Sequence, residues 1–169
     1  MGTLSGTTVM ITGASRGLGR ALARAAAREG AALAICARGG DALEAVAEEC
    51  RANSVEVLAV LADIADASDV ERFAATALER FGGIDVLVNN AAELGPLPLP
   101  QLTDAPSSAL EHVLQANVLG PLRLTQAVTG QNSAVSTSAP RLAPSNGFSH
   151  AQLAYQGTRS NTIKGERKS

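Results

Sequence analysis

The chain has 169 residues and a formal net charge of −2, and alanine dominates its apolar composition, with three Phe, one Tyr and no Trp. This length suits one domain, and the few aromatic rings leave few platforms for stacking bases, so nucleic acid is not an expected partner. The cysteines, Cys36 and Cys50, lack paired spacing and the two histidines lie far apart, which argues against a disulfide framework or a metal site.

The first residues carry no recognisable targeting signal. No basic segment precedes an apolar run, and Gly6 stands where a myristoylation signal requires Ser or Thr. No apolar run approaches the length needed to span a bilayer. We therefore expect a cytoplasmic protein with reduced cysteines and no membrane partner.

Apolar runs alternate with helical patterns along the first 128 residues, which is typical of βαβ units and a parallel sheet. Strands are predicted at about 8–12, 32–37, 55–61 and 84–88. Helices are predicted at about 17–29, 41–52, 68–81 and 108–128, the last despite Pro121. Asp41 is the predicted cap of the second helix, Gly30 the stop of the first, and 68–71 and 108–111 the predicted capping boxes of the last two.

The composition changes near residue 129. More than half of residues 129–169 are Ser, Thr, Asn, Gln, Gly or Pro, and Glu166 is the single acid there. Such a segment buries little apolar surface to offset its ordering entropy. We predict one folded domain over 1–128 and a polar, partly disordered tail over 129–169.

A glycine-rich turn, ITGASRGLGR, follows the first predicted strand and opens the first helix. Gly13, Gly17 and Gly19 would let the backbone approach a pyrophosphate, whose negative charge the helix N-terminus attracts. The same glycines would equally serve a tight strand-to-helix crossing. Alone, the triplet leaves both interpretations open.

Three further motifs follow the turn: Asp63-Ile64, Asn89-Asn90-Ala91-Ala92 and Asn117-Val118-Leu119-Gly120-Pro121. Their order and spacing resemble the short-chain dehydrogenase/reductase family over residues 1–128. The resemblance implies a Rossmann-like, doubly wound parallel sheet in three α/β/α layers, a nicotinamide dinucleotide, and hydride transfer between a carbonyl and an alcohol. The family's later strands have no counterpart here, so we expect the C-terminal strands to be missing.

The resemblance also implies roles for single residues. Gly13, Gly17 and Gly19 would form the pyrophosphate turn, with contacts from Ser15 and Leu18. Asp63 and Ile64 would meet the adenine, and Asn90 and Ala91 the nicotinamide ribose. Alternatives are that Asp63 serves a turn or helix cap and that Asn90 closes its strand. Ala92 stands where the family usually has Gly.

The end of the second strand bears on the choice of cofactor. NAD-preferring enzymes usually have an acid there, but this chain has Ala37 followed by Arg38. Arg38 and Arg16 could bind a 2′-phosphate through charge-assisted hydrogen bonds, so we predict that NADP(H) is preferred over NAD(H). The alternative for each Arg is a solvated surface charge.

The catalytic residues follow the family pattern only in part. Asn117 matches the active-site Asn, and Pro121 removes the N–H that its carbonyl would normally accept, which leaves the carbonyl free for a water of the family's proton relay. Alternatively, Asn117 is satisfied at a helix kink. Tyr155 matches the catalytic Tyr, but Arg159 replaces the expected Lys, and Arg cannot release a proton. Ser138 is the candidate catalytic Ser.

Two functions are consistent with these residues. The first is an NADP(H)-dependent oxidoreductase that acts on a small carbonyl or alcohol substrate, with impaired activity. The second is a non-catalytic dinucleotide-binding or degenerate fragment, with Tyr155 incidental in a Ser-rich tail. A sheet without its later strands exposes an edge and an apolar face, so we expect aggregation of the monomer or a partner, such as a homo-oligomer.

Overall fold

The computed structural model describes residues 2–101, 103–130 and 152–155, in which strands and helices alternate as predicted. The strands are β1 (Thr8–Thr12), β2 (Ala32–Ala37), β3 (Val57–Leu61), β4 (Val86–Asn89) and β5 (Gln152–Tyr155). The helices are α1 (Gly17–Arg28), α2 (Gly40–Arg51), α3 (Ala67–Phe81), α4 (Ser107–Leu114), the π-helical turn η1 (Gln115–Leu119) and α5 (Gly120–Thr129).

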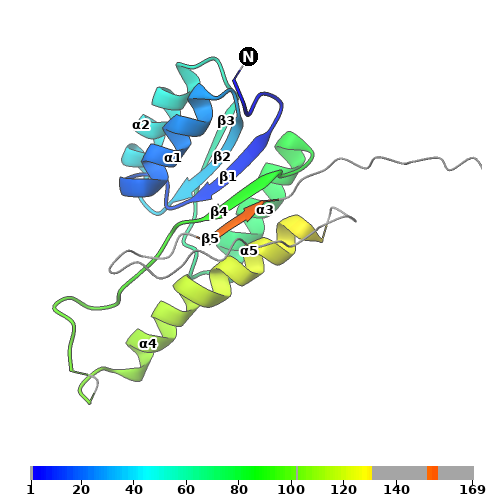
Figure 1. Ribbon diagram of the computed structural model, residues 1–169. Coiled ribbons are helices and arrows are strands. Elements are labelled where there is room, and N and C mark those ends of the chain that lie inside the picture. Colours follow the sequence, from blue (N-terminus) through cyan, green and yellow to red (C-terminus); the bar gives the residue numbers. More distant parts are fainter. Residues whose placement is uncertain (1, 102, 131–151, 156–169) are drawn as a thin grey trace, which may run out of the picture.

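The strands form one sheet in the order β3-β2-β1-β4-β5. All neighbours from β3 to β4 are parallel, and β5 pairs antiparallel with β4. Helices α1 and α2 cover one face, and α3 and α5 cover the other (Figure 1). The arrangement confirms the predicted Rossmann-like α/β fold. The sequence does not predict β5, because its four residues lie in a polar segment.

Both faces of β1, β2 and β4 are largely buried, which explains their nearly continuous apolar sequences, whereas the edge strand β3 is only half-buried. Val9 and Ile11 of β1 pack toward α1 and α2, whereas Met10 faces the cluster of α3 and α5 around Phe73. Alternate side chains of one strand thus enter two separate cores. The small residues Ala23, Ala26 and Ala27 allow α1 to pack closely on the sheet.

Three of the predicted helix caps are wrong. Helix α3 is capped by Asp66, whose carboxylate accepts from the N–H groups of Ser68 and Asp69, because an Asp one position before the helix reaches these donors directly. Helix α2 begins at Gly40, so Asp41 lies in its first turn, and α4 follows Pro106 without a side-chain cap. Gly30, with φ of +85°, ends α1 as predicted.

The predicted helix over 108–128 is interrupted. Between α4 and α5 the backbone widens into η1, where the N–H of Gly120 donates to the carbonyl of Gln115, five residues earlier. Pro121 then occupies the first turn of α5. A π turn changes the bonding register beside a residue that has no N–H, and this accommodates the proline without breaking the helix.

One side of the α4–α5 segment is apolar and exposed. None of the α4 side chains is buried, and this helix projects beyond the edge of the sheet (Figure 1). The exposed side chains, one helical turn apart, are Leu110, Leu114, Val118 and Leu122. Nothing within the described residues covers them, and a homo-oligomer remains a prediction. Within the same residues no helix combines the length and apolarity needed to cross a bilayer.

Candidate dinucleotide-binding site

A cleft of about 520 Å³ opens at the carboxyl ends of the parallel strands. It lies where the strand order reverses between β1 and β4, the usual position of ligand sites in doubly wound sheets. Eight of the residues predicted to bind cofactor line it: Gly13, Ser15, Arg16, Arg38, Asp63, Ile64, Asn90 and Ala91. Gly17, Leu18 and Gly19 follow in the same turn, with the side chain of Leu18 exposed.

Gly13 and Gly19 hold the turn against the end of β4. A Cβ on Gly13, where φ is +66°, would lie 2.9 Å from the Cα of Ala91, and one on Gly19 would lie 2.5 Å from Nδ2 of Asn90. A Cβ on Gly19 would also overlap the carbonyl of Gly13. Gly13 and Gly19 therefore allow β1, α1 and the end of β4 to pack closely. This agrees with the alternative interpretation of the motif, a tight strand-to-helix crossing.

Gly17 differs from the other two. Its φ is +56°, and no atom of the described residues lies within 4 Å of the position that a Cβ would take. The N-terminus of α1 beside it has no side-chain cap and no acid in its first turn. Free N–H groups, a helix dipole and open space together fit the phosphates of a dinucleotide.

Thr12 and Asn90 join β1 to the end of β4. The hydroxyl of Thr12 accepts from the N–H groups of Asn90 and Ala91, at 3.0 Å each. The amide of Asn90 donates to the carbonyls of Thr12 (2.9 Å) and Gly13 (3.1 Å). Asn90 thus fixes the glycine turn while lining the cleft, so its two interpretations are compatible. Thr12 opens the glycine motif, but nothing in the sequence pattern marks it as a site residue.

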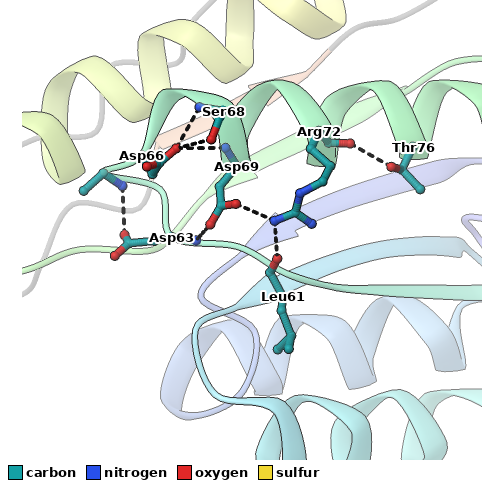
Figure 2. A network of polar contacts seen from close by, with 8 residues as sticks. Leu61, Asp63, Asp66, Ser68, Asp69, Arg72 and Thr76 are labelled. Atoms are coloured by element: carbon teal, nitrogen blue, oxygen red, sulfur yellow. Dashed lines mark hydrogen bonds and ion pairs between the residues drawn. The ribbon is translucent and has the colours of Figure 1, made fainter.

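Asp63 is held in place by the start of α3 (Figure 2). Its N–H donates to Oδ2 of Asp69 at 2.8 Å, while its own Oδ1 accepts from the N–H of Ala65 at 2.9 Å. Arg72 pairs with Asp69 and donates to the carbonyl of Leu61 at 2.9 Å. Asp63 therefore serves a turn, and its second carboxylate oxygen remains for the cleft. Asp69, which the sequence reasoning missed, is a positioning residue.

The loop after β3 also packs against α5. A Cβ on Gly120 would overlap the carbonyl and the side chain of Ile64. The small residue lets the helix approach the loop closely, which keeps the buried side chain of Ile64 at the wall of the cleft. The glycine of the Asn117–Pro121 motif thus has a packing role at the predicted adenine site.

The two arginines predicted to bind a phosphate differ in their surroundings. Arg16, the residue before α1, is exposed, and no carboxylate among the described residues pairs with it. Arg38 lies between two carboxylates: its Nη1 is 3.4 Å from Oε1 of Glu93 and 4.0 Å from Oδ2 of Asp63. Glu93 is a further cleft residue that no motif in the sequence identifies.

Asn117 does not line the cleft but bonds to Glu93, which does. Its side-chain Oδ1 accepts from the N–H of Glu93 and its Nδ2 donates to the carbonyl of the same residue, both at 2.8 Å. The side chain therefore fixes the backbone that follows β4. This agrees with the alternative interpretation, in which the polar groups of the Asn117 side chain are hydrogen-bonded beside a helix irregularity. A role of its backbone carbonyl in a proton relay remains a prediction.

A comparison with known proteins identifies the family. The short chain dehydrogenase family model matches residues 7–136. The chain belongs to the short-chain dehydrogenase family. It is 40% identical over 108 residues to 1-deoxy-11-beta-hydroxypentalenate dehydrogenase of Streptomyces exfoliatus, an alignment that covers 64% of this chain and 39% of the relative.

Solved structures give the same result. An alcohol dehydrogenase from the archaeon Thermococcus sibiricus, complexed with 5-hydroxy-NADP, matches with a TM-score of 0.68 and 40% identity, over 74% of this chain and 52% of that one. NAD+-bound xylitol dehydrogenase matches with a TM-score of 0.70 and 31% identity, over 76% and 49%. The alignments thus cover 39% to 52% of the length of these three proteins.

Only some of the residues predicted from the family resemblance to be catalytic lie among the described residues. Ser138 and Arg159 lie outside the described residues. In β5 the backbone of Tyr155 pairs with Val86 at the start of β4, whereas Gln152 pairs with Asn89 at its end. At roughly 3.3 Å per residue, the Tyr155 backbone is ~10 Å along the strand from the edge that carries the cleft.

Neither cysteine of the chain is available as a nucleophile. Cys36 is fully buried at the end of β2, and its carbonyl accepts from the N–H of Ala14 at 3.0 Å. Burial raises the pKa of its thiol to about 12. Burial likewise raises the pKa of Cys50. Both thiols remain protonated near neutral pH and contribute as small apolar side chains.

The hydrogen bonds that Asp69 accepts from Asp63 and Arg72 are expected to make the stability of the fold sensitive to acid. The hydrogen bond from the N–H of Asp63, followed by that from Arg72, holds the pKa of Asp69 below its ordinary value of 3.8. Because the folded-state pKa is the lower one, the stabilisation is complete above 3.8 and is lost as pH falls below it. Asp69→Asn should lower Tm near neutral pH by about 2 to 4 °C.

Thermal unfolding followed by circular dichroism between pH 3 and 7 measures this effect. The difference between Asp69→Asn and the unchanged chain should shrink toward pH 3, since protonation removes the same charge. Asp41→Asn is the matched control, because Asp41 is exposed in the first turn of α2. A pH-independent difference for Asp69→Asn would contradict the role assigned to the carboxylate.

Proposed function

We propose that the cleft binds a nicotinamide dinucleotide, with NADP(H) preferred over NAD(H). We propose further that the chain functions as an oxidoreductase acting on a small carbonyl or alcohol. The observation that carries this proposal is the pairing of the open, uncapped N-terminus of α1 at Gly17 with Arg16 and Arg38 around one cleft. The cytoplasmic location and the domain boundary near residue 129 stay predictions.

The residues around the cleft suit the parts of such a cofactor. The first turn of α1 would hold the pyrophosphate, and Asp63 with Ile64 would form the adenine site. Arg38 and Arg16 would meet a 2′-phosphate, and Asn90 with Ala91 would face the nicotinamide ribose. When bound, the nicotinamide ring supplies or accepts the hydride. The matching structures include complexes with 5-hydroxy-NADP and with NAD+, so the preference rests on the two arginines.

A second candidate is a dinucleotide-binding chain without catalysis. It is favoured by the register of β5, in which the Tyr155 backbone pairs with Val86 rather than with the cleft end of β4. It is favoured further by Arg159, since a guanidinium keeps its proton where a lysine would pass it on. Both candidates share the cofactor site and differ only in the reaction.

Binding and turnover measured on the same preparation separate the two candidates. We expect NADPH fluorescence titration to show saturable binding, while ketone-dependent NADPH oxidation is slower by ~10² to 10⁴ than in an enzyme with a working acid/base group. Tyr155→Phe should then change the residual rate little. Turnover at ordinary enzyme rates that Tyr155→Phe abolishes would establish the catalytic candidate. Absence of NADPH and NADH binding would contradict both.

A further inference from the structure

Glu93 occupies an unusual place in the cleft. It follows Ala91 and Ala92 at the end of β4, 55 residues from Arg38, yet the two side chains meet across the cleft. The motif comparison gives no role to this position. The geometry around it bears directly on what Arg38 can bind.

The backbone of Glu93 is fixed before its side chain makes any contact. Two hydrogen bonds of 2.8 Å join its N–H and its carbonyl to the amide of Asn117. This pair of bonds determines where the side chain leaves the main chain. The Glu93 carboxylate is therefore presented to the cleft by a rigid support, and its side chain is only 25% exposed.

Each oxygen of the carboxylate has a cationic or polar partner. Oε2 lies 2.7 Å from Nε2 of His112, on α4, and Oε1 lies 3.4 Å from Nη1 of Arg38. His112 thus helps to keep the carboxylate directed at the cleft. On its other side, Arg38 faces Asp63 at 4.0 Å. The guanidinium is shared between two carboxylates.

This arrangement opposes a 2′-phosphate. A phosphate monoester carries about −1.5 to −2 charge near pH 7 and would have to take Arg38 from Glu93 or accept repulsion from it. A free 2′-hydroxyl carries no charge and can donate a hydrogen bond to a carboxylate. Arg38, Glu93 and Asp63 are therefore expected to bind a cofactor with a 2′-phosphate less favourably than one with a free 2′-hydroxyl.

We propose that Glu93 is a specificity-determining residue: by holding Arg38, it lowers the affinity of the cleft for a 2′-phosphorylated adenosine relative to one with a free 2′-hydroxyl. This inference rests on the proposed function, because it assumes that the adenosine of a dinucleotide lies beside Arg38. Under it, Arg38 and Arg16 favour NADP(H), and Glu93 limits the size of that preference.

Glu93→Gln tests the proposal with little change of shape. The bonds to Asn117 involve only the backbone of Glu93, so the support remains. Calorimetric titration should show that adenosine 2′,5′-bisphosphate binds about three- to tenfold more tightly to the variant, as expected for two partly exposed charges in contact. Binding of 5′-AMP should change less than twofold, and NADPH and NADH should follow the same pattern.

Two controls separate this role from a general effect of charge. Glu49→Gln makes the same change in net charge at a carboxylate that pairs with Arg20 and Arg24, none of which lines the cleft. It should leave both affinities unchanged. In an Arg38→Gln background, Glu93→Gln should no longer strengthen bisphosphate binding, because the interaction it relieves is already absent.

The outcomes distinguish this inference from the proposed function. If the unchanged chain binds NADPH, NADH and 5′-AMP but Glu93→Gln leaves the bisphosphate-to-AMP ratio unchanged, or strengthens both ligands equally, the specificity role is wrong and the cofactor site stands. If the unchanged chain binds none of these ligands, the proposed function fails and the inference fails with it. A ratio that rises only where Arg38 is present supports the proposal.

Discussion

Replacing Gly19 with alanine is expected to destabilise the fold and to weaken dinucleotide binding more than tenfold. The new Cβ would lie 2.5 Å from Nδ2 of Asn90 and would overlap the carbonyl of Gly13. Because one of these neighbours is backbone, the turn itself must move. Overpacking of this kind typically costs ~1 to 3 kcal/mol of unfolding free energy. The displaced turn would also misalign the N–H groups at the start of α1.

Urea unfolding and NADPH titration measure the two parts of this prediction. Gly40→Ala is the control, since a Cβ there would make only ordinary contacts at 3.7 and 3.8 Å with the side chain of Leu61. This control should unfold within about 0.5 kcal/mol of the unchanged chain. If Gly19→Ala were equally harmless, the close packing of the turn on Asn90 would not be required for the fold.

The alternation of strands and helices follows directly from the sequence. Strands β1 and β2 begin and end as predicted because buried parallel strands have continuous apolar runs with sharp limits, such as Gly13 after Thr12. Strand β3 starts two residues late, at Val57, since Val55 is apolar but precedes the pairing with β2. Periodicity therefore locates elements well and their ends less well.

Local chemistry at the helix ends is harder to predict. Ser68 and Asp66 are both good caps, and only the backbone geometry before α3 decides that the carboxylate of Asp66 accepts the two N–H groups. Likewise, Pro121 predicts an irregularity in the helix, but no local pattern distinguishes a kink from the π turn that forms at 115–119, where Gly120 packs closely against Ile64.

The cleft likewise contains residues that the sequence locates and contacts that it does not. Its glycines, Asn90 and Asp63 follow strand ends, so the sequence places them at one edge of the sheet. The contacts of Glu93 cannot be predicted this way, because they join the segments after β2 and β4 to α4 across separations of 55 residues to Arg38 and 19 to His112. Such partners depend on the strand order and on side-chain conformations that no local pattern encodes.

Arg38→Asp is expected to reverse the order of cofactor affinity from NADPH first to NADH first. In the unchanged chain the guanidinium lies between Asp63 and Glu93 and partly neutralises both. Under the proposed function, removing it deletes a charge-assisted interaction with a 2′-phosphate, and the new carboxylate adds a third negative charge. A shift in the NADPH-to-NADH affinity ratio of about a hundredfold or more follows from these two effects together.

Fluorescence titration of both cofactors at fixed ionic strength measures this ratio, since screening by salt would otherwise mask part of the effect. Arg24→Asp is the control with the same change in net charge, because Arg24 lies on α1 beside Glu49 and does not line the cleft. NADH should gain from the substitution, since a ribose 2′-hydroxyl can donate to the new carboxylate, as it does to the acid usual at this position in NAD-preferring enzymes. A ratio that moves less than threefold would mean that Arg38 does not meet the 2′ position and that its ion pairs with Asp63 and Glu93 serve only the fold.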